Sequence, residues 1–120
     1  MNYEFSFEKL EVWKSSVELT KLIYSLTNEF PDNEKFGLIS QLRRASISVA
    51  SNLAEGTSRQ TNKDKAHFTT MSFSSLMEVL NQLVLAKELN FISEEKYDKV
   101  RNEIGEISRM LNALRKAQLK

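Results

Sequence analysis

The stretch QLRRASISVASNLAEGTSRQ, residues 41–60, has no charged residue between Arg44 and Glu55. Most of the ten residues in between are Ala, Ser or Asn, and in a helix they point in every direction. A helix without a charged side is normally covered all round, whereas every helix of a lone four-helix bundle has a side open to water. We therefore expect this helix to pack closely and to meet a second subunit, with a large ligand as the alternative.

The composition of the whole chain points to helices. Its 120 residues include one proline and three glycines, and no run alternates polar and apolar residues for long. Apolar residues recur three and four positions apart instead. We expect helices over residues 6–29 and 34–59, a third that follows an N-cap at Asn62 and ends near Asn90, and a fourth capped by Ser93.

Four such helices predict one fold. Each spans about 25 residues, or roughly 37 Å, and short connections make successive helices antiparallel. The expected fold is an all-α, up-down-up-down antiparallel four-helix bundle in a single domain, residues 1–120. Its fourth helix carries one narrow apolar seam, formed by Val100, Ile104, Ile107, Leu111 and Leu114.

The formal charge alternates along the chain. It is −3 over residues 1–40, +3 over 41–67, −2 over 68–100 and +3 over 101–120, for a net charge of +1. Acidic and basic helices of this kind favour pairing between helices, with a basic surface stripe for a ligand as the alternative.

A second uncharged segment strengthens the case for self-association. TTMSFSSLM, residues 69–77 in the third helix, includes two methionines and a phenylalanine. Monomers seldom leave large apolar patches bare. We therefore expect a homo-oligomer.

Polar residues at the edges of residues 41–60 predict a structural network. Gln41, Arg44, Ser48, Asn52 and Glu55 are spaced three and four apart, so they share one helix face, and Glu78 of the third helix could face them. We expect a partly buried ion pair between Arg44 and Glu55 or Glu78 that fixes the register of the helices. Metal binding or acid–base chemistry by the two carboxylates is the alternative.

The sequence offers little else for chemistry. It has no cysteine, one histidine (His67), no glycine-rich phosphate loop and no Glu-x-x-His element. We expect a protein that is not an enzyme and holds no cofactor or metal. The sequence has no run of about 20 apolar residues that could cross a membrane, and residues 1–16 do not have the pattern of a secretory signal. We therefore expect a cytoplasmic protein without a membrane partner.

Nucleic acid is a further candidate ligand. Arg59, Lys63 and Lys65 cluster where the second and third helices join, and Arg109, Arg115 and Lys116 add positive charge in the fourth. Clustered basic residues bind phosphates. In a ring of subunits, several weak patches of this kind would bind one nucleic acid together, and avidity would raise the overall affinity.

Three segments carry a resemblance to a known family. They are FEKLEVWKSSVELTKLIYSLTNEFP, EKFGLISQLRRASISVASNLAEGTSR and FSSLMEVLNQLVLAKELNFI, and the core string QLRRASISVASNLAEG is the most specific. From Phe7 to about Leu114 the chain resembles the small proteins encoded in intervening sequences of bacterial 23S rRNA genes. It differs at Ser74-Ser75, where the family often has Gly-Ser.

The resemblance implies a four-helix bundle that assembles into a ring, typically a pentamer. It also implies kinship with the accessory variability proteins of diversity-generating retroelements, which bind nucleic acid and a reverse transcriptase. Two hypotheses follow: an oligomeric scaffold for a protein or nucleic-acid partner, and a nucleic-acid-binding ring that assists an RNA- or DNA-processing enzyme.

Overall fold

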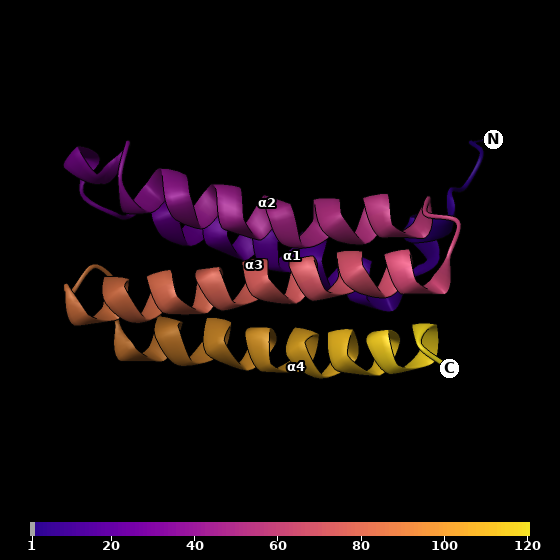
Figure 1. The fold of residues 1–120 in the computed structure, drawn as a ribbon. Helices are drawn as coiled ribbons and strands as arrows, with labels where there is room; N and C mark the ends of the chain where they lie inside the picture. The colour runs from indigo at the N-terminus through magenta and orange to yellow at the C-terminus, as the bar shows by residue number, and fades with distance from the viewer. Residues whose placement is uncertain (1) are drawn as a thin grey trace.

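Four long helices lie side by side in the computed structural model, which describes residues 2–120 (Figure 1). They are α1 (Glu11–Thr27), α2 (Leu38–Thr57), α3 (Asn62–Glu88) and α4 (Glu94–Gln118), with the short 3₁₀ helices η1 (Ser6–Lys9) and η2 (Asp32–Glu34) before α1 and α2. No strand occurs within residues 2–120. The predicted all-α antiparallel four-helix bundle is confirmed.

The helices are arranged in a closed circuit. Each packs against the helix that follows it in the chain, and α1 also packs against α4. The face between α2 and α3 therefore lies on the opposite side of the bundle from the face between α1 and α4. The bundle measures 43 × 33 × 23 Å.

The first two helices begin later than predicted. Leu10 is extended, with φ −73° and ψ 123°, so residues 6–9 form η1 and α1 starts at Glu11. Gly37 leaves helical geometry at φ −109° and ψ −113°, so α2 starts at Leu38 rather than at residue 34. Helical spacing continues through both breaks, and spacing alone therefore cannot locate them.

The other helix ends follow from local hydrogen bonds. Ser93 caps α4 as predicted, accepting the Lys96 N–H at 3.2 Å. The cap of α3 is Thr61, one residue before the predicted Asn62, and its Oγ1 accepts the Asp64 N–H at 3.1 Å. Asn90 follows α3 with φ 64°, a left-handed conformation that asparagine tolerates and that often ends helices.

One hydrophobic core runs the length of the bundle. The predicted seam of α4 faces it, with Val100, Ile104, Ile107 and Leu111 buried and Leu114 partly buried against them. From α2 and α3 the core receives Leu42, Val49, Leu53, Leu76, Val79 and Leu83. None of the helices between residues 2 and 120 combines the length and apolar character needed to cross a membrane.

Small residues bring α2 and α3 close together. A Cβ added at Gly56 would lie 2.9 Å from the Phe68 Cβ. The buried Ser72 hydroxyl donates to the Val49 carbonyl at 2.8 Å, and Ser48 and Ser75 share a 2.9 Å hydrogen bond. The chain itself therefore covers much of the uncharged segment, and only its outward side is left open.

Candidate functional site

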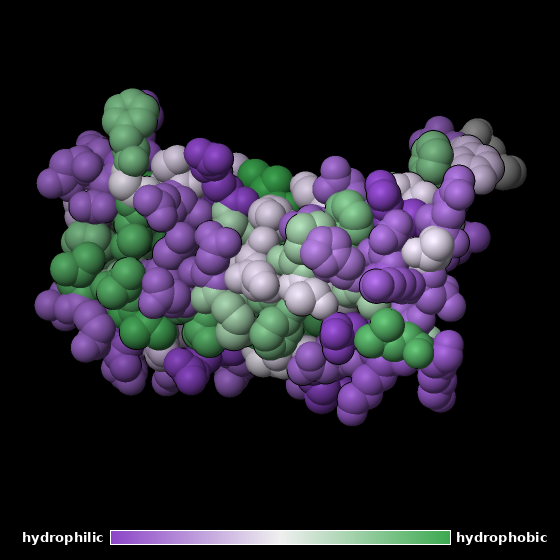
Figure 2. Space-filling view, in the orientation of Figure 1, coloured by the Kyte–Doolittle hydropathy of each residue, from purple (hydrophilic) through white to green (hydrophobic). Residues whose placement is uncertain are grey.

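The outward side of α2 and α3 forms a surface that we call the α2–α3 face. Helical spacing aligns one stripe from each helix along it, and all of its residues are exposed or half-buried: Ser40, Arg44, Ile47, Ser51 and Glu55 from α2, and Met71, Ser74, Glu78, Asn81 and Leu85 from α3. Weakly polar and apolar residues, white to green, cross the middle of this side of the molecule between purple margins (Figure 2).

Two aliphatic side chains stand out on the α2–α3 face. Ile47 is 44% exposed and Leu85 is 45% exposed. Arg44, Glu55 and Glu78 are its only charged residues. The face therefore has few charges for a surface along the middle of two long helices, and these charges are of both signs.

A groove of about 380 Å³ opens on this face. Its lining comes from the segment between η2 and α2, from α2 itself and from α3: Phe36, Ser40, Gln41, Arg44, Ala45, Ser48, Glu78 and Gln82. The Gln82 Nε2 donates to Gln41 Oε1 at 3.3 Å. Beside the groove, Asn52 Nδ2 donates to the hydroxyl of the lining residue Ser48 at 3.1 Å.

The predicted polar network is only partly assembled. Gln41, Arg44 and Glu78 line the same groove, and Asn52 bonds to Ser48 beside it. However, within the described chain Arg44 forms no ion pair within 4.0 Å with Glu55 or Glu78. The expected intrachain ion pair is therefore wrong: all three side chains are exposed, and Glu55 lies three turns along α2, roughly 16 Å from Arg44.

Gln82 is a buried groove residue that the sequence interpretation missed, and Phe36 and Ser40 also line the groove without having been predicted. Gln82 is only 8% exposed, and it lies one helical turn after Glu78, on the same side of α3. That spacing was the available signal, but a glutamine on a long helix does not by itself indicate burial.

The candidate nucleic-acid residues gather mostly at one end of the bundle. Arg59, Lys63 and Lys65 lie at the α2–α3 connection, and the C-terminus of α4 ends beside it (Figure 1). Two hydrogen bonds hold α4 there: Thr69 Oγ1 to Gln118 Oε1 at 2.7 Å, and Arg115 Nε to Thr70 Oγ1 at 2.9 Å. We call this cluster of Arg59, Lys63, Lys65, Arg115 and Lys116 the basic end.

Several of these cations already have partners. Arg59 lies 3.7 Å from the Asp64 carboxylate and 5.2 Å from the Phe68 ring centre. Arg109 pairs with Glu106 and lies two turns before Arg115, roughly 9 Å away along α4. Arg109 therefore lies further along α4 than the basic end, and its predicted contribution to nucleic-acid binding stays a prediction.

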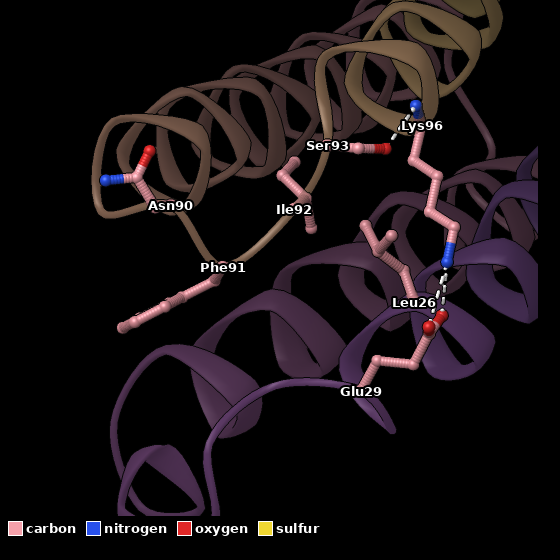
Figure 3. A pocket seen from close by; sticks show the side chains of 7 residues that line it. All are labelled: Leu26, Glu29, Asn90, Phe91, Ile92, Ser93 and Lys96. Atoms are coloured by element: carbon pink, nitrogen blue, oxygen red, sulfur yellow. Dashed lines mark hydrogen bonds and ion pairs between the residues drawn. The ribbon is translucent and has the colours of Figure 1, made fainter.

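A larger hollow of about 460 Å³ lies at the other end of the bundle, where α1 faces the start of α4 (Figure 3). Lys96 reaches across it to Glu29, with Nζ 2.7 Å from the carboxylate. Nearby, a hydrogen bond from Lys87 to Glu94 raises the pKa of the lysine. The two charged residues that line this hollow, Glu29 and Lys96, are thus paired with each other within the chain.

No cluster of three or more His, Cys, Asp or Glu side chains that could hold a metal ion occurs within residues 2–120. The α2–α3 face and its groove therefore offer contacts through hydrogen bonds, aliphatic groups and unpaired charges. These are the properties of an interaction surface.

Comparison with known proteins agrees with this fold. No curated protein matches the chain. A crystal structure described as a protein with unknown function from the S23 ribosomal protein family, from Bacteroides thetaiotaomicron, is similar at 22% identity and a TM-score of 0.76, over 85% of this chain and 95% of that one. The family model for the 23S rRNA-intervening sequence protein matches residues 8–113. The chain belongs to the 23S rRNA-intervening sequence protein family.

Proposed function

We propose that this protein is a non-catalytic cytoplasmic scaffold that assembles with copies of itself through the α2–α3 face. The observation that carries the proposal is the character of that face. It has two exposed aliphatic side chains, small polar residues and three charges that form no ion pair with residues 2–120: Arg44, Glu55 and Glu78. The resemblance to ring-forming bundles favours a ring, with five subunits as the expected number.

A second copy suits this surface for two physical reasons. Covering Ile47 and Leu85 removes apolar area from water, which contributes on the order of 1 kcal/mol for each half-exposed side chain. The face also carries one cation and two anions, so it can pair with charges of either sign on a different surface of the neighbouring copy, as a ring requires, and it discriminates against partners of a single sign. The remaining faces of the ring would be free to hold a protein or nucleic-acid partner.

Charged replacements on the α2–α3 face test this proposal. The double variant Ile47→Asp, Leu85→Asp is expected to convert the assembly to monomers while keeping the helical circular dichroism spectrum, because both side chains are nearly half exposed in the single chain. Light scattering coupled to size exclusion checks the mass. Leu119→Asp, at a residue that is 51% exposed at the far end of α4, is the matched control and is expected to leave the mass unchanged. A wild-type mass of 13.9 kDa at high protein concentration would overturn the scaffold.

A second candidate function is binding of RNA or DNA in support of a nucleic-acid-processing enzyme. The basic end favours it, since Lys63, Lys65 and Lys116 have no ion pair within the described residues and come from two distant segments. Repeated around a ring, five basic ends would act together through avidity.

Salt dependence distinguishes this candidate from a protein scaffold. Arg59→Ala, Lys63→Ala, Lys65→Ala is expected to reduce the slope of log affinity against log salt by about 2 to 3, because each phosphate contact contributes about 0.9. Fluorescence anisotropy with a structured RNA at several salt concentrations measures the slope. The control variant replaces three lysines outside the basic end by alanine, at Lys14, Lys21 and Lys99. It should change the slope of log affinity against log salt little. An RNA that stays free at low salt would contradict the candidate function.

A further inference from the structure

The α3–α4 side of the bundle borders the α2–α3 face, because α3 belongs to both (Figure 1). Five uncharged residues of this side lie between Arg101 and Arg115: Phe73, Met77, Gly105, Ser108 and Asn112. We call these five residues and the two arginines the α3–α4 surface. It has a hollow of about 190 Å³ beside Phe73 and a gap at Gly105, where an added Cβ meets nothing within 4 Å.

The two arginines of this surface are held in place and still have free donors. Arg101 donates to the Tyr97 hydroxyl at 2.6 Å, and Arg115 Nε donates to the Thr70 hydroxyl at 2.9 Å. A guanidinium has five N–H groups, and neither arginine has a carboxylate within 4.0 Å among residues 2–120. The α3–α4 surface is therefore basic, whereas two of the three charges on the α2–α3 face belong to glutamates.

Ring closure limits which surface can meet the α2–α3 face. Each copy in a ring uses two different surfaces, and for four to six subunits their outward directions differ by roughly 90° to 120°. Opposite sides of a bundle would build an open filament instead, which excludes the α1–α4 side. Adjacent sides of a four-helix bundle lie roughly 90° apart, so the second surface lies on the α3–α4 or the α1–α2 side.

The α1–α2 side is the poorer match in charge. Arg43, the basic residue between these two helices, already donates to Thr27 and Asn28 and lies over the Tyr24 ring, 4.4 Å from its centre. The 3₁₀ helix η1 packs against both α1 and α2. This side therefore has its cation in use and part of its length covered by the chain itself.

We propose that the α2–α3 face of one copy covers the α3–α4 surface of the next copy, with α2 of the first lying along α4 of the second. The inference rests on the proposed self-association and names the surface that completes it. The charge that specifies the contact is a pair between Glu55 of one copy and Arg115 of the next. Neither side chain has an ion pair within residues 2–120.

The two residues of this pair lie at the same height along the bundle. Gly56, next to Glu55, faces Phe68 of α3, and Arg115 bonds to Thr70, two residues further along α3. Glu55 and Arg115 therefore differ in height by roughly one helical turn at most. Since α2 and α4 run in the same direction, a ring axis along the helices brings the two residues of neighbouring copies together.

The same register accommodates Arg44. Arg44 and Glu55 are 11 residues apart on α2, and Gly105 and Arg115 are 10 residues apart on α4. The Glu55–Arg115 pair therefore places Arg44 at the gap left by Gly105 of the next copy, beside the exposed Glu106. The position without a side chain thus meets the longest side chain of the α2–α3 face.

Gly105→Arg tests the α3–α4 surface. It fills the gap and places a second guanidinium against Arg44, so we expect monomers by light scattering coupled to size exclusion. The fold should persist, because an added Cβ meets nothing within 4 Å and arginine favours a helix over glycine. Ala113→Arg, exposed on the side of α4 away from the core, is the matched control and should leave the mass unchanged.

A mixture of two variants separates a ring contact from a two-fold one. Ile47→Asp, Leu85→Asp keeps the α3–α4 surface, and Gly105→Arg keeps the α2–α3 face, so an equimolar mixture should form a dimer of twice 13.9 kDa. Gly105→Arg that assembles like the wild type, or a mixture that stays monomeric, would overturn the α3–α4 surface as the partner and leave the scaffold in place. A monomeric wild-type protein would overturn both.

A charge exchange tests the register. Glu55→Arg and Arg115→Glu are each expected to raise the dissociation constant about tenfold, and the double variant to recover most of that loss. Sedimentation velocity over a dilution series measures the constants. Lys99→Glu with Glu103→Arg, on the α1–α4 side, is the control and should change nothing. A double variant that associates no more tightly than the single variants would overturn the Glu55–Arg115 contact.

Discussion

Gly56→Val is expected to lower the free energy of unfolding by about 2 to 3 kcal/mol, the usual cost of forcing extra atoms into a packed contact. The reason is the 2.9 Å separation between a Cβ at position 56 and the Phe68 Cβ of α3. Neither atom is the flexible tip of a side chain, so the two helices must move apart. Urea denaturation followed by circular dichroism measures the change.

Gly105 provides the matched control. It lies in the middle of α4, where an added Cβ meets nothing within 4 Å. Gly105→Ala should therefore raise the free energy of unfolding by about 1 kcal/mol, the difference in helix propensity between glycine and alanine. Equal effects at the two positions would show that α2 and α3 do not approach as closely as the structure has them.

Ser72→Leu is expected to have the second large effect, a loss of about 3 kcal/mol. Ser72 is fully buried between α3 and α2, and leucine adds three carbon atoms where the Val49 carbonyl is now 2.8 Å from the hydroxyl oxygen. Thermal unfolding monitored by circular dichroism gives the result.

Ser72→Ala separates the effect of size from that of the hydrogen bond. The Val49 carbonyl keeps its bond within α2, so losing the serine hydroxyl should cost only about 1 kcal/mol. If alanine proved as damaging as leucine, the hydroxyl rather than the small volume would be the reason for serine at this position.

The sequence predicted the fold well where periodicity and capping coincide. The seam from Val100 to Leu111 and the Ser93 cap identify α4 because burial and a local hydrogen bond depend on residues close in sequence. The starts of α1 and α2 were missed because they depend on single backbone angles, at Leu10 and Gly37, that leave the spacing of apolar residues unchanged.

The candidate site was predicted less completely. Helical spacing placed Gln41, Arg44 and Glu78 near one another, and they do line one groove. It could not show that the arginine and the glutamate remain apart, since exposed side chains gain little from pairing in water. Nor could it show how deeply Gln82 is buried, which depends on the distance between α2 and α3.

The uncharged segment itself had two explanations that the sequence could not separate. A helix rich in Ala and Ser can be covered by its own chain or by another. The structure assigns Ser46, Val49 and Gly56 to contacts within the chain, and leaves Ile47 and Ser51 exposed.

The serines and the glycine between α2 and α3 have an effect beyond the bundle interior. They fix how far apart the two helix axes stand, and so they set the width of the strip that a docking molecule would have to span. Residues buried between the two helices thereby control the shape of the outer surface. A substitution at one of these buried positions could therefore change which molecules bind there.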